Sequence, residues 1–197
     1  MKRAIALLAA LLCLLSLFAG CAKKEKKSPY LKGKHHVEIE VRDYGTIALE
    51  LDADTAPISV TNFINLAKSG FYDGLTFHRV KSGFVIQGGD PLGNGTGGSE
   101  DPIMGEFEAN GIENDISHVR GTVSMARRSA SYNSASSQFF IVHEDSTYMD
   151  GYYAGFGHVT SGMEVVDAIC ESVPVLDDKG SVAKKDQPVI DAVRVID

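Results

Sequence analysis

Residues 77–90 read FHRVKSGFVIQGGD, and this stretch decides the fold. Its alternating apolar run, interrupted by a Ser-Gly pair and ended by Gly-Gly-Asp, predicts two strands joined by a turn. Arg79 lies on the first strand, where a two-residue period would place its side chain on the face of Phe77 and leave His78 on the opposite face. Phe84 follows the turn and could form an apolar surface beside the guanidinium. Such neighbours favour a binding or catalytic arginine over one that serves only a surface salt bridge.

Similar patterns recur along the chain and predict a mainly β domain. The expected strands are residues 37–41, 47–51, 76–80, 84–87, 122–126, 138–143, 155–159 and 189–196. Helical spacing predicts one helix that begins at Pro57 and ends before Gly70, and a second over residues 163–171. Together these elements predict a closed antiparallel eight-stranded β-barrel capped by two α-helices, because closure removes exposed strand edges.

Two long stretches, residues 91–120 and 172–188, show neither the two-residue period of a strand nor the 3.6-residue period of a helix. Loops of such length in a compact domain usually carry function or are mobile. Residues 175–180 have turn chemistry, and we expect them to form a surface loop.

The first 20 residues have the pattern of an export signal. Lys2 and Arg3 precede an apolar run of 15 residues, 4–18, which is shorter than the about 20 residues of a transmembrane helix. Small residues then stand directly before Cys21, which resembles a bacterial lipobox. Cys21 would become the lipid-carrying first residue of the mature protein. An ordinary signal peptide followed by an incidental cysteine is the alternative.

The chain is thus expected to comprise a lipoprotein signal peptide (residues 1–20), a lipidated basic tether (21–34) and one folded domain (35–197). Residues 1–34 hold eight Lys or Arg and one Glu, so the formal charge of −7 for the whole chain leaves −14 for residues 35–197. An acidic domain argues against nucleic acid as a partner. The tether would lie near an anionic membrane surface. We therefore expect an extracytoplasmic protein that is lipid-anchored to a bacterial cell membrane.

The cysteines do not allow an intramolecular disulfide in the mature domain. Cys13 lies in the signal peptide and Cys21 is the expected lipid site, which leaves Cys170 alone. Cys170 lies in a helical pattern and is expected to be a buried small hydrophobe rather than a reactive thiol.

Five short motifs occur in a fixed order along the chain. They are FHR-x4-F-x2-QGGD at residues 77–90, GTGG at 95–98, SMA at 124–126, SQFF at 137–140 and FG at 156–157. In this order they resemble the cyclophilin family of peptidyl-prolyl cis-trans isomerases, over roughly residues 37–197. The resemblance implies a monomeric enzyme without cofactor or metal, which isomerises Xaa-Pro bonds of exported proteins as they fold.

The resemblance also implies roles for individual residues. Arg79 would be catalytic, and Gln87 would hold both Arg79 and the substrate carbonyl in register. The apolar pocket for the proline ring would consist of Phe84, Val85, Phe140 and Met149. The residue that precedes proline would lie over Ala126 and Gln138.

Three positions depart from the family's eukaryotic members. Arg127 replaces an asparagine whose backbone binds the peptide, so the change need not abolish that contact. Tyr148 stands where cyclosporin-sensitive members have tryptophan, and Tyr153 where many of them have histidine. Because these residues would form the rim of the pocket, the resemblance predicts weak cyclosporin binding with the catalytic arginine retained.

The chemistry of an isomerase suits Arg79. Rotation about a prolyl amide needs neither nucleophile nor proton relay, because its barrier of about 18–20 kcal/mol comes from amide resonance. At the twisted transition state the prolyl nitrogen gains a lone pair, and a guanidinium N–H could donate to it. This bond is stronger in the transition state than in the planar substrate, which is the condition for catalysis.

Other functions remain open from the sequence. A barrel that only grips proline-containing segments, as a chaperone or scaffold, could lose the arginine, so the presence of Arg79 favours an enzyme. A structural envelope lipoprotein is a weaker alternative. A hydrolase triad drawn from Ser124, Ser137, His143 and Asp150 lacks the Gly-x-Ser-x-Gly motif of a nucleophile elbow.

Overall fold

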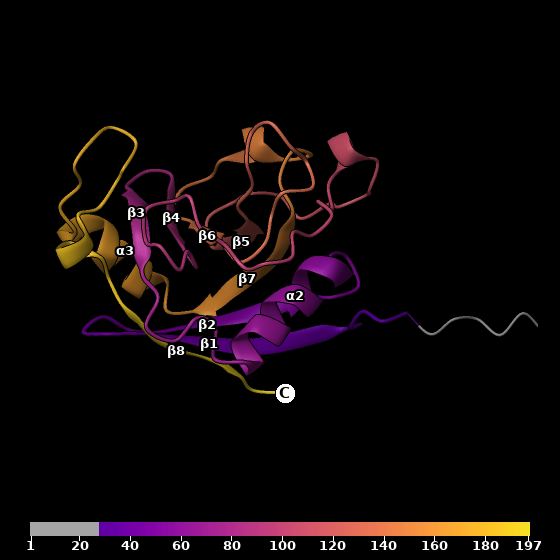
Figure 1. Ribbon diagram of the computed structural model, residues 1–197, viewed down its shortest axis with the longest axis horizontal. Helices are drawn as coiled ribbons and strands as arrows, with labels where there is room; N and C mark the ends of the chain where they lie inside the picture. Colours follow the sequence, from indigo (N-terminus) through magenta and orange to yellow (C-terminus); the bar gives the residue numbers. More distant parts are fainter. Residues whose placement is uncertain (1–27) are drawn as a thin grey trace, which may run out of the picture.

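The computed structural model describes residues 28–197, which form one antiparallel sheet and two α-helices (Figure 1). The predicted signal peptide and half of the predicted tether, residues 21–27 with Cys21, lie outside the described residues. The strands are β1 (Lys34–Val41), β2 (Gly45–Asp52), β3 (Phe77–Lys81), β4 (Val85–Gly88), β5 (Thr122–Met125), β6 (Phe139–Val142), β7 (Gly155–Ser161) and β8 (Ile190–Val195). The helices are α2 (Pro57–Lys68) and α3 (Met163–Ser172), with short 3-10 turns η2 (Glu108–Asn110), η3 (Thr147–Met149) and η4 (Lys184–Asp186). All eight predicted strands and both predicted helices are present.

The strands follow the order β3-β4-β6-β5-β7-β2-β1-β8. Each ladder between neighbours is antiparallel. Within residues 28–197, the end strands β3 and β8 form no ladder, and an isolated bridge between Thr76 and Val189 joins the segments beside them. The barrel is therefore open, and the prediction of a closed barrel was wrong.

The loop that follows α3 explains the opening. The Val80 N–H donates to the Gly180 carbonyl at 2.8 Å, and the Val182 N–H donates to the His78 carbonyl at 3.0 Å. The loop thus satisfies the outer edge of β3 in place of β8. An edge strand whose polar groups are covered in this way does not need a closed barrel.

The main core fills the interior of the curled sheet. Phe63 of α2 lies centrally, with ring centroids 5.0 Å from Tyr72 and 5.3 Å from both Phe139 and Phe156. Because successive strand residues point to opposite faces, alternate residues of β4 and β6 leave this core. Those residues, Val85, Phe140 and Val142, form with Met149 a second apolar cluster on the outer face.

Cys170 of α3 is half-buried against the main core. Burial raises the pKa of its thiol to about 12. The thiol is therefore protonated at neutral pH, as expected for an inert packing residue.

Neither α-helix of residues 28–197 has the length and hydropathy needed to cross a bilayer.

Candidate active site

The second apolar cluster forms the floor of a small cavity of about 110 Å³ on the outer face of β3, β4 and β6. Nine of the residues implied by the family resemblance line it: Arg79, Phe84, Val85, Gln87, Ala126, Arg127, Phe140, Met149 and Tyr153. Gln138 and Tyr148 lie beside it, through contacts described below. The predicted site is thus brought together in one place, although its members come from four separate parts of the chain.

A β-bulge in β3 orients Arg79. Phe77 pairs with Gly88 and Arg79 pairs with Gln87, so that His78 is an extra residue opposite the ladder. The extra residue shifts the alternation. Phe77 accordingly packs in the main core, whereas Arg79 lies over the outer face. The expectation that Phe77 and Arg79 share a face was wrong for this reason.

The guanidinium of Arg79 is held from three sides. Its Nε donates to the Lys179 carbonyl at 2.7 Å, and its Nη1 donates to Gln87 Oε1 at 3.2 Å. Its Cζ lies 5.4 Å from the centroid of the Phe84 ring, within the range of a cation–π contact. Burial lowers the pKa of Arg79 from its ordinary value. An arginine still remains charged at neutral pH, so a fixed positive charge borders the cavity.

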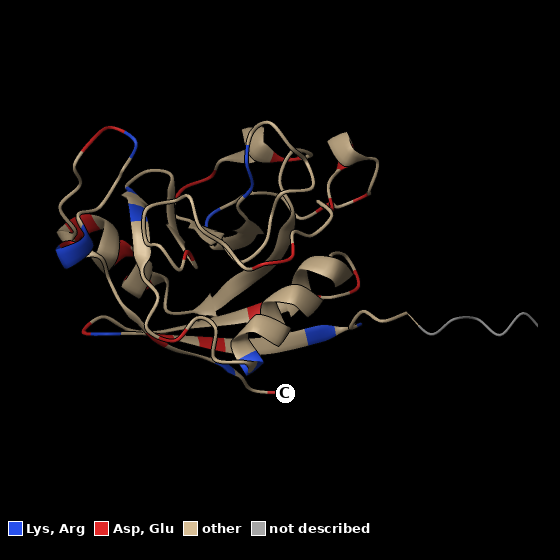
Figure 2. Ribbon diagram, viewed as in Figure 1, with Lys and Arg blue, Asp and Glu red and all other residues tan. Residues whose placement is uncertain are grey.

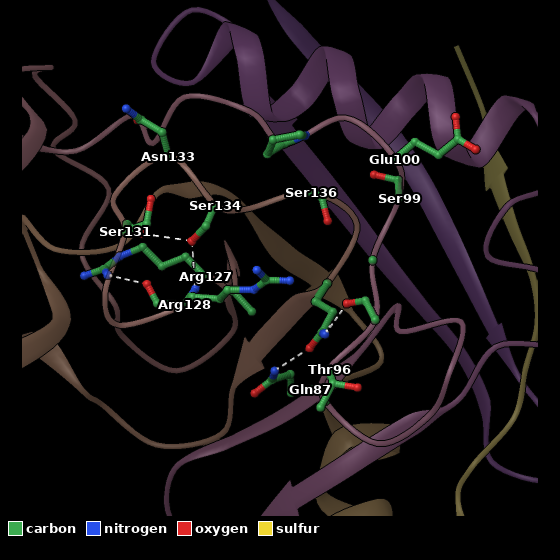
Figure 3. A pocket seen from close by; sticks show the side chains of 16 residues that line it. Gln87, Thr96, Ser99, Glu100, Arg127, Arg128, Ser131, Asn133, Ser134 and Ser136 are labelled. Atoms are coloured by element: carbon green, nitrogen blue, oxygen red, sulfur yellow. Dashed lines mark hydrogen bonds between the residues drawn. The ribbon is translucent and has the colours of Figure 1, made fainter.

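A chain of amides fixes Gln87 in turn. Gln87 Nε2 donates to Gln138 Oε1 at 2.8 Å, and Gln138 Nε2 donates to the Gly97 carbonyl at 2.7 Å, as the dashed lines in Figure 3 show. These bonds settle the orientation of both side-chain amides. Gln87 Oε1 is therefore available to Arg79.

The Gly97 carbonyl belongs to the glycine-rich loop, residues 91–98. Asp90, whose side chain is buried, anchors this loop. Its carboxylate accepts the N–H groups of Leu92 at 2.9 Å, Asn94 at 3.0 Å and Gly95 at 2.6 Å. Burial opposes the charge, yet these donors hold the pKa of Asp90 below its usual value. No pattern in the sequence indicates this role, because the acceptor and its donors belong to an irregular segment.

Aromatic rings surround Arg127. Its Cζ lies 4.6 Å from the ring centroid of Tyr153, 5.0 Å from that of Tyr132 and 5.3 Å from that of Phe107. Its Nε donates to the Tyr152 carbonyl at 2.9 Å. Arg127 stands between the small cavity and a second, polar cavity of about 490 Å³ (Figure 3).

The two tyrosines occupy the rim. Tyr148 is 72% exposed and its ring stacks on Phe84, with centroids 6.1 Å apart and an interplanar angle of 20°. Tyr153 packs edge-on against Phe140 at 5.9 Å. Tyr148 can therefore contact a ligand without supporting the core.

His118, which lies behind the cavity, was not among the residues predicted from the sequence. Its ring stacks on Phe140 at 6.0 Å, and its nitrogens lie 2.8 Å from Asp150 Oδ1 and 3.0 Å from Ser124 Oγ. Burial lowers its pKa, although Asp150 opposes the shift. Both His118 and Ser124 are fully buried, so this Ser-His-Asp arrangement supports Phe140 and offers no accessible nucleophile.

The remaining members of the imagined triad lie in other contacts. His143 Nδ1 accepts the Gly83 N–H at 2.9 Å, and Ser137 Oγ donates to the Gly89 carbonyl at 2.7 Å. Neither side chain contacts Ser124 or Asp150 within the described chain. These contacts provide no basis for hydrolase chemistry.

Comparison with known proteins agrees with this geometry. The family model for cyclophilin type peptidyl-prolyl cis-trans isomerases matches residues 36–195. A peptidyl-prolyl cis-trans isomerase of Helicobacter pylori (strain ATCC 700392 / 26695) is 47% identical over 127 residues, which are 64% of this chain and 74% of that protein. Peptidyl-prolyl cis-trans isomerase B of Bacillus subtilis (strain 168) is 48% identical over 124 residues, covering 63% of this chain and 82% of the relative.

A solved structure agrees as well. The crystal structure of a Cryptosporidium parvum cyclophilin type isomerase in the presence of the dipeptide Ala-Pro superposes with a TM-score of 0.72 at 30% identity. The match covers 82% of this chain and 99% of that chain. The chain therefore belongs to the cyclophilin family and is a peptidyl-prolyl cis-trans isomerase.

Proposed function

We propose that this isomerase rotates Xaa-Pro bonds through Arg79, and that it assists the folding of exported proteins as a monomer anchored to the bacterial cell membrane through Cys21. The observation that carries the catalytic part is the position of Arg79. Its guanidinium is fixed by Lys179 and Gln87 beside an apolar cavity that suits a proline ring.

The proline ring would lie on Phe84, Phe140 and Met149. The residue before it would lie over Ala126 and Gln138, with Gln87 near its carbonyl. The cavity of about 110 Å³ is small and apolar at its floor, which favours a compact ring over a charged side chain. The Ala-Pro dipeptide present with the Cryptosporidium parvum relative supports a substrate of this class.

Arg79 would then act on the prolyl nitrogen. Its Nε and Nη1 are held by the protein, whereas its Nη2 makes no hydrogen bond within residues 28–197 and can donate to the substrate. As the amide twists, the nitrogen lone pair becomes an acceptor, and the bond to Arg79 strengthens. A thousandfold acceleration requires about 4 kcal/mol of such preferential stabilisation.

The test is Arg79→Ala, assayed by NMR exchange on an Ala-Pro peptide. We expect kcat/KM to fall at least tenfold while the circular dichroism spectrum is unchanged, because the lost donor acts mainly in the transition state. Arg194→Ala is the matched control, since Arg194 pairs with Glu40 on the exposed surface of β8. Unchanged turnover by folded Arg79→Ala protein would refute the proposed role.

The anchoring part of the proposal depends on the sequence. The basic n-region, the short apolar run and the small residues before Cys21 together support lipidation. Stable attachment of a lipidated protein to a membrane usually takes two signals. The lipid on Cys21 would be the first, and the lysines that follow Cys21 would be the second, through attraction to anionic lipids.

Cys21→Ser tests this part independently of catalysis. We expect the variant to lose incorporation of labelled palmitate and to leave the membrane fraction, because serine lacks the sulfur atom that would form the thioether to the lipid. Cys170→Ser is the matched control, since that thiol is half-buried against the core. Palmitate labelling that persists in Cys21→Ser would show that the lipid is attached elsewhere.

A further inference from the structure

A third cavity, of about 790 Å³, adjoins the proposed proline site. It lies between residues 92–95 of the glycine-rich loop and the segment at residues 176–187, with β3 along one side. Arg79, Gln87 and Arg127 line both this cavity and the small apolar one. A polypeptide bound at the proline site could therefore continue into this space.

The lining of this cavity is positively charged. Arg79, Arg127, Lys179 and Lys184 line it, and none of its lining residues is Asp or Glu. Residues 35–197 carry a formal charge of −14, so such a group of cations contrasts with the rest of the domain. Figure 2 shows blue segments on β3, on η4 and in the loop before η4.

These lysines have no partner of opposite charge in the described part of the chain. None of the ion pairs among residues 28–197 includes Lys179 or Lys184. The nearby carboxylate of Asp177 accepts the Lys179 and Ser181 N–H groups, each at 3.0 Å, and the Ser181 hydroxyl at 2.9 Å. That of Asp90 accepts backbone N–H groups of its own loop. Neither carboxylate forms an ion pair with the two lysines, although the charge of Asp177 still acts on Lys179 and on Arg79.

From these features we infer that the cavity binds the carboxylate of an Asp or Glu in the client polypeptide, within a few residues of the isomerised proline. This inference rests on the proposed placement of proline in the adjoining cavity. An anionic lipid headgroup fits less well, because the described chain begins at Ser28, at the opposite end of the long axis from the loop before η4 (Figure 1). The site thus gives the isomerase a preference among Xaa-Pro sequences.

The experiment compares peptides that differ in one charge. Ala-Pro peptides carry Glu or Gln at each of three positions before and three positions after the dipeptide, and the full-length protein in detergent is assayed by NMR exchange. At one or more positions we expect kcat/KM to be about fivefold higher for Glu than for Gln, equivalent to about 1 kcal/mol. The preference should disappear at about 0.5 M salt, because exposed charges are then screened.

Two neighbouring lysines of η4 supply the decisive variants. Lys184 lines the cavity, whereas Lys185 does not. Lys184→Glu should remove most of the preference, because the new carboxylate repels the acidic peptide although three cations remain. Lys185→Glu should leave the fivefold ratio unchanged. Both variants should isomerise the peptide without acidic residues at the wild-type rate.

Equal kcat/KM for Glu and Gln at every position would overturn the inference. So would a preference that survives Lys184→Glu, or one that Lys185→Glu removes to the same extent. An error in the proline site would be seen separately, as unchanged turnover of the neutral peptide by Arg79→Ala.

Discussion

Replacing Asp90 by asparagine tests whether the glycine-rich loop holds the side chain of Arg79 in position. The buried carboxylate accepts three backbone N–H groups, with Oδ1 bound to Leu92 and Oδ2 bound to Asn94 and Gly95. The amide of Asn has one oxygen instead of two. If that oxygen takes the place of Oδ2, the amide nitrogen faces the Leu92 N–H, and two donors oppose each other.

The cost follows from this geometry. One charge-assisted hydrogen bond is lost, two bonds lose their charge, and the part-buried Leu92 N–H loses its acceptor. A bond to a charged group contributes about 1.5–3 kcal/mol and a neutral one about 0.5–1.5 kcal/mol. Because water can replace part of the lost bonding at Leu92, we expect a loss of about 2–4 kcal/mol in the free energy of unfolding. Equilibrium urea unfolding measures this loss. Asp101→Asn, at an exposed carboxylate of the same irregular segment, is the control and should change little.

Activity should fall together with stability. The loop holds Gln138 through the Gly97 carbonyl, Gln138 holds Gln87, and Gln87 holds Arg79. A displacement of about 1 Å at a catalytic group can cost about a hundredfold in rate, so we expect about a tenfold loss of kcat/KM in Asp90→Asn. A variant within 1 kcal/mol of wild-type stability and with wild-type turnover would refute the chain of contacts.

The same residue predicts a dependence on pH. Because the folded-state pKa of Asp90 lies below its usual value, its contribution is complete above the unfolded-state pKa of about 3.9. The contribution is lost as the pH falls through the lower, folded-state pKa. Asp90→Asn should therefore flatten the acid limb of the stability profile below about pH 4.

Two further predictions concern the proline site and its rim. Phe140→Ala removes a buried ring that packs against His118 and Tyr153, so we expect a loss of about 3–5 kcal/mol in unfolding free energy and weaker binding of proline peptides in NMR titrations. Unchanged peptide affinity would place the proline elsewhere. Tyr148→Trp should tighten cyclosporin inhibition at least fivefold, since an indole adds contact area and an N–H donor at an exposed position over Phe84, while kcat/KM stays within about threefold of wild type. Tight inhibition of the wild-type enzyme would contradict this view of the rim.

The sequence by itself determined the local elements, and the family's motif order predicted which residues would gather around one cavity. Strands were found because one buried face imposes a two-residue period, and helices because Pro57 and Gly70 bound an apolar spacing of 3.6 residues. The motif order also predicted the residues that line the cavity, and in the structure β4 and β6 pair directly and bring Gln87 opposite Phe140. These features depend on local pattern or on the family's motif order.

Only the tertiary structure decided how Arg79 is held. The bulge at His78 turned Arg79 away from the face of Phe77, and no period in the sequence reports an unpaired extra residue. Lys179, expected in a surface loop, orients Arg79 from 100 residues away, and the same loop keeps the barrel open. Contacts between residues so far apart in the sequence depend on how the chain closes its long loops. The acceptor is also a backbone carbonyl, which every residue has, so no residue type in the sequence marks it. For that reason the position of Arg79 follows from the assembled fold.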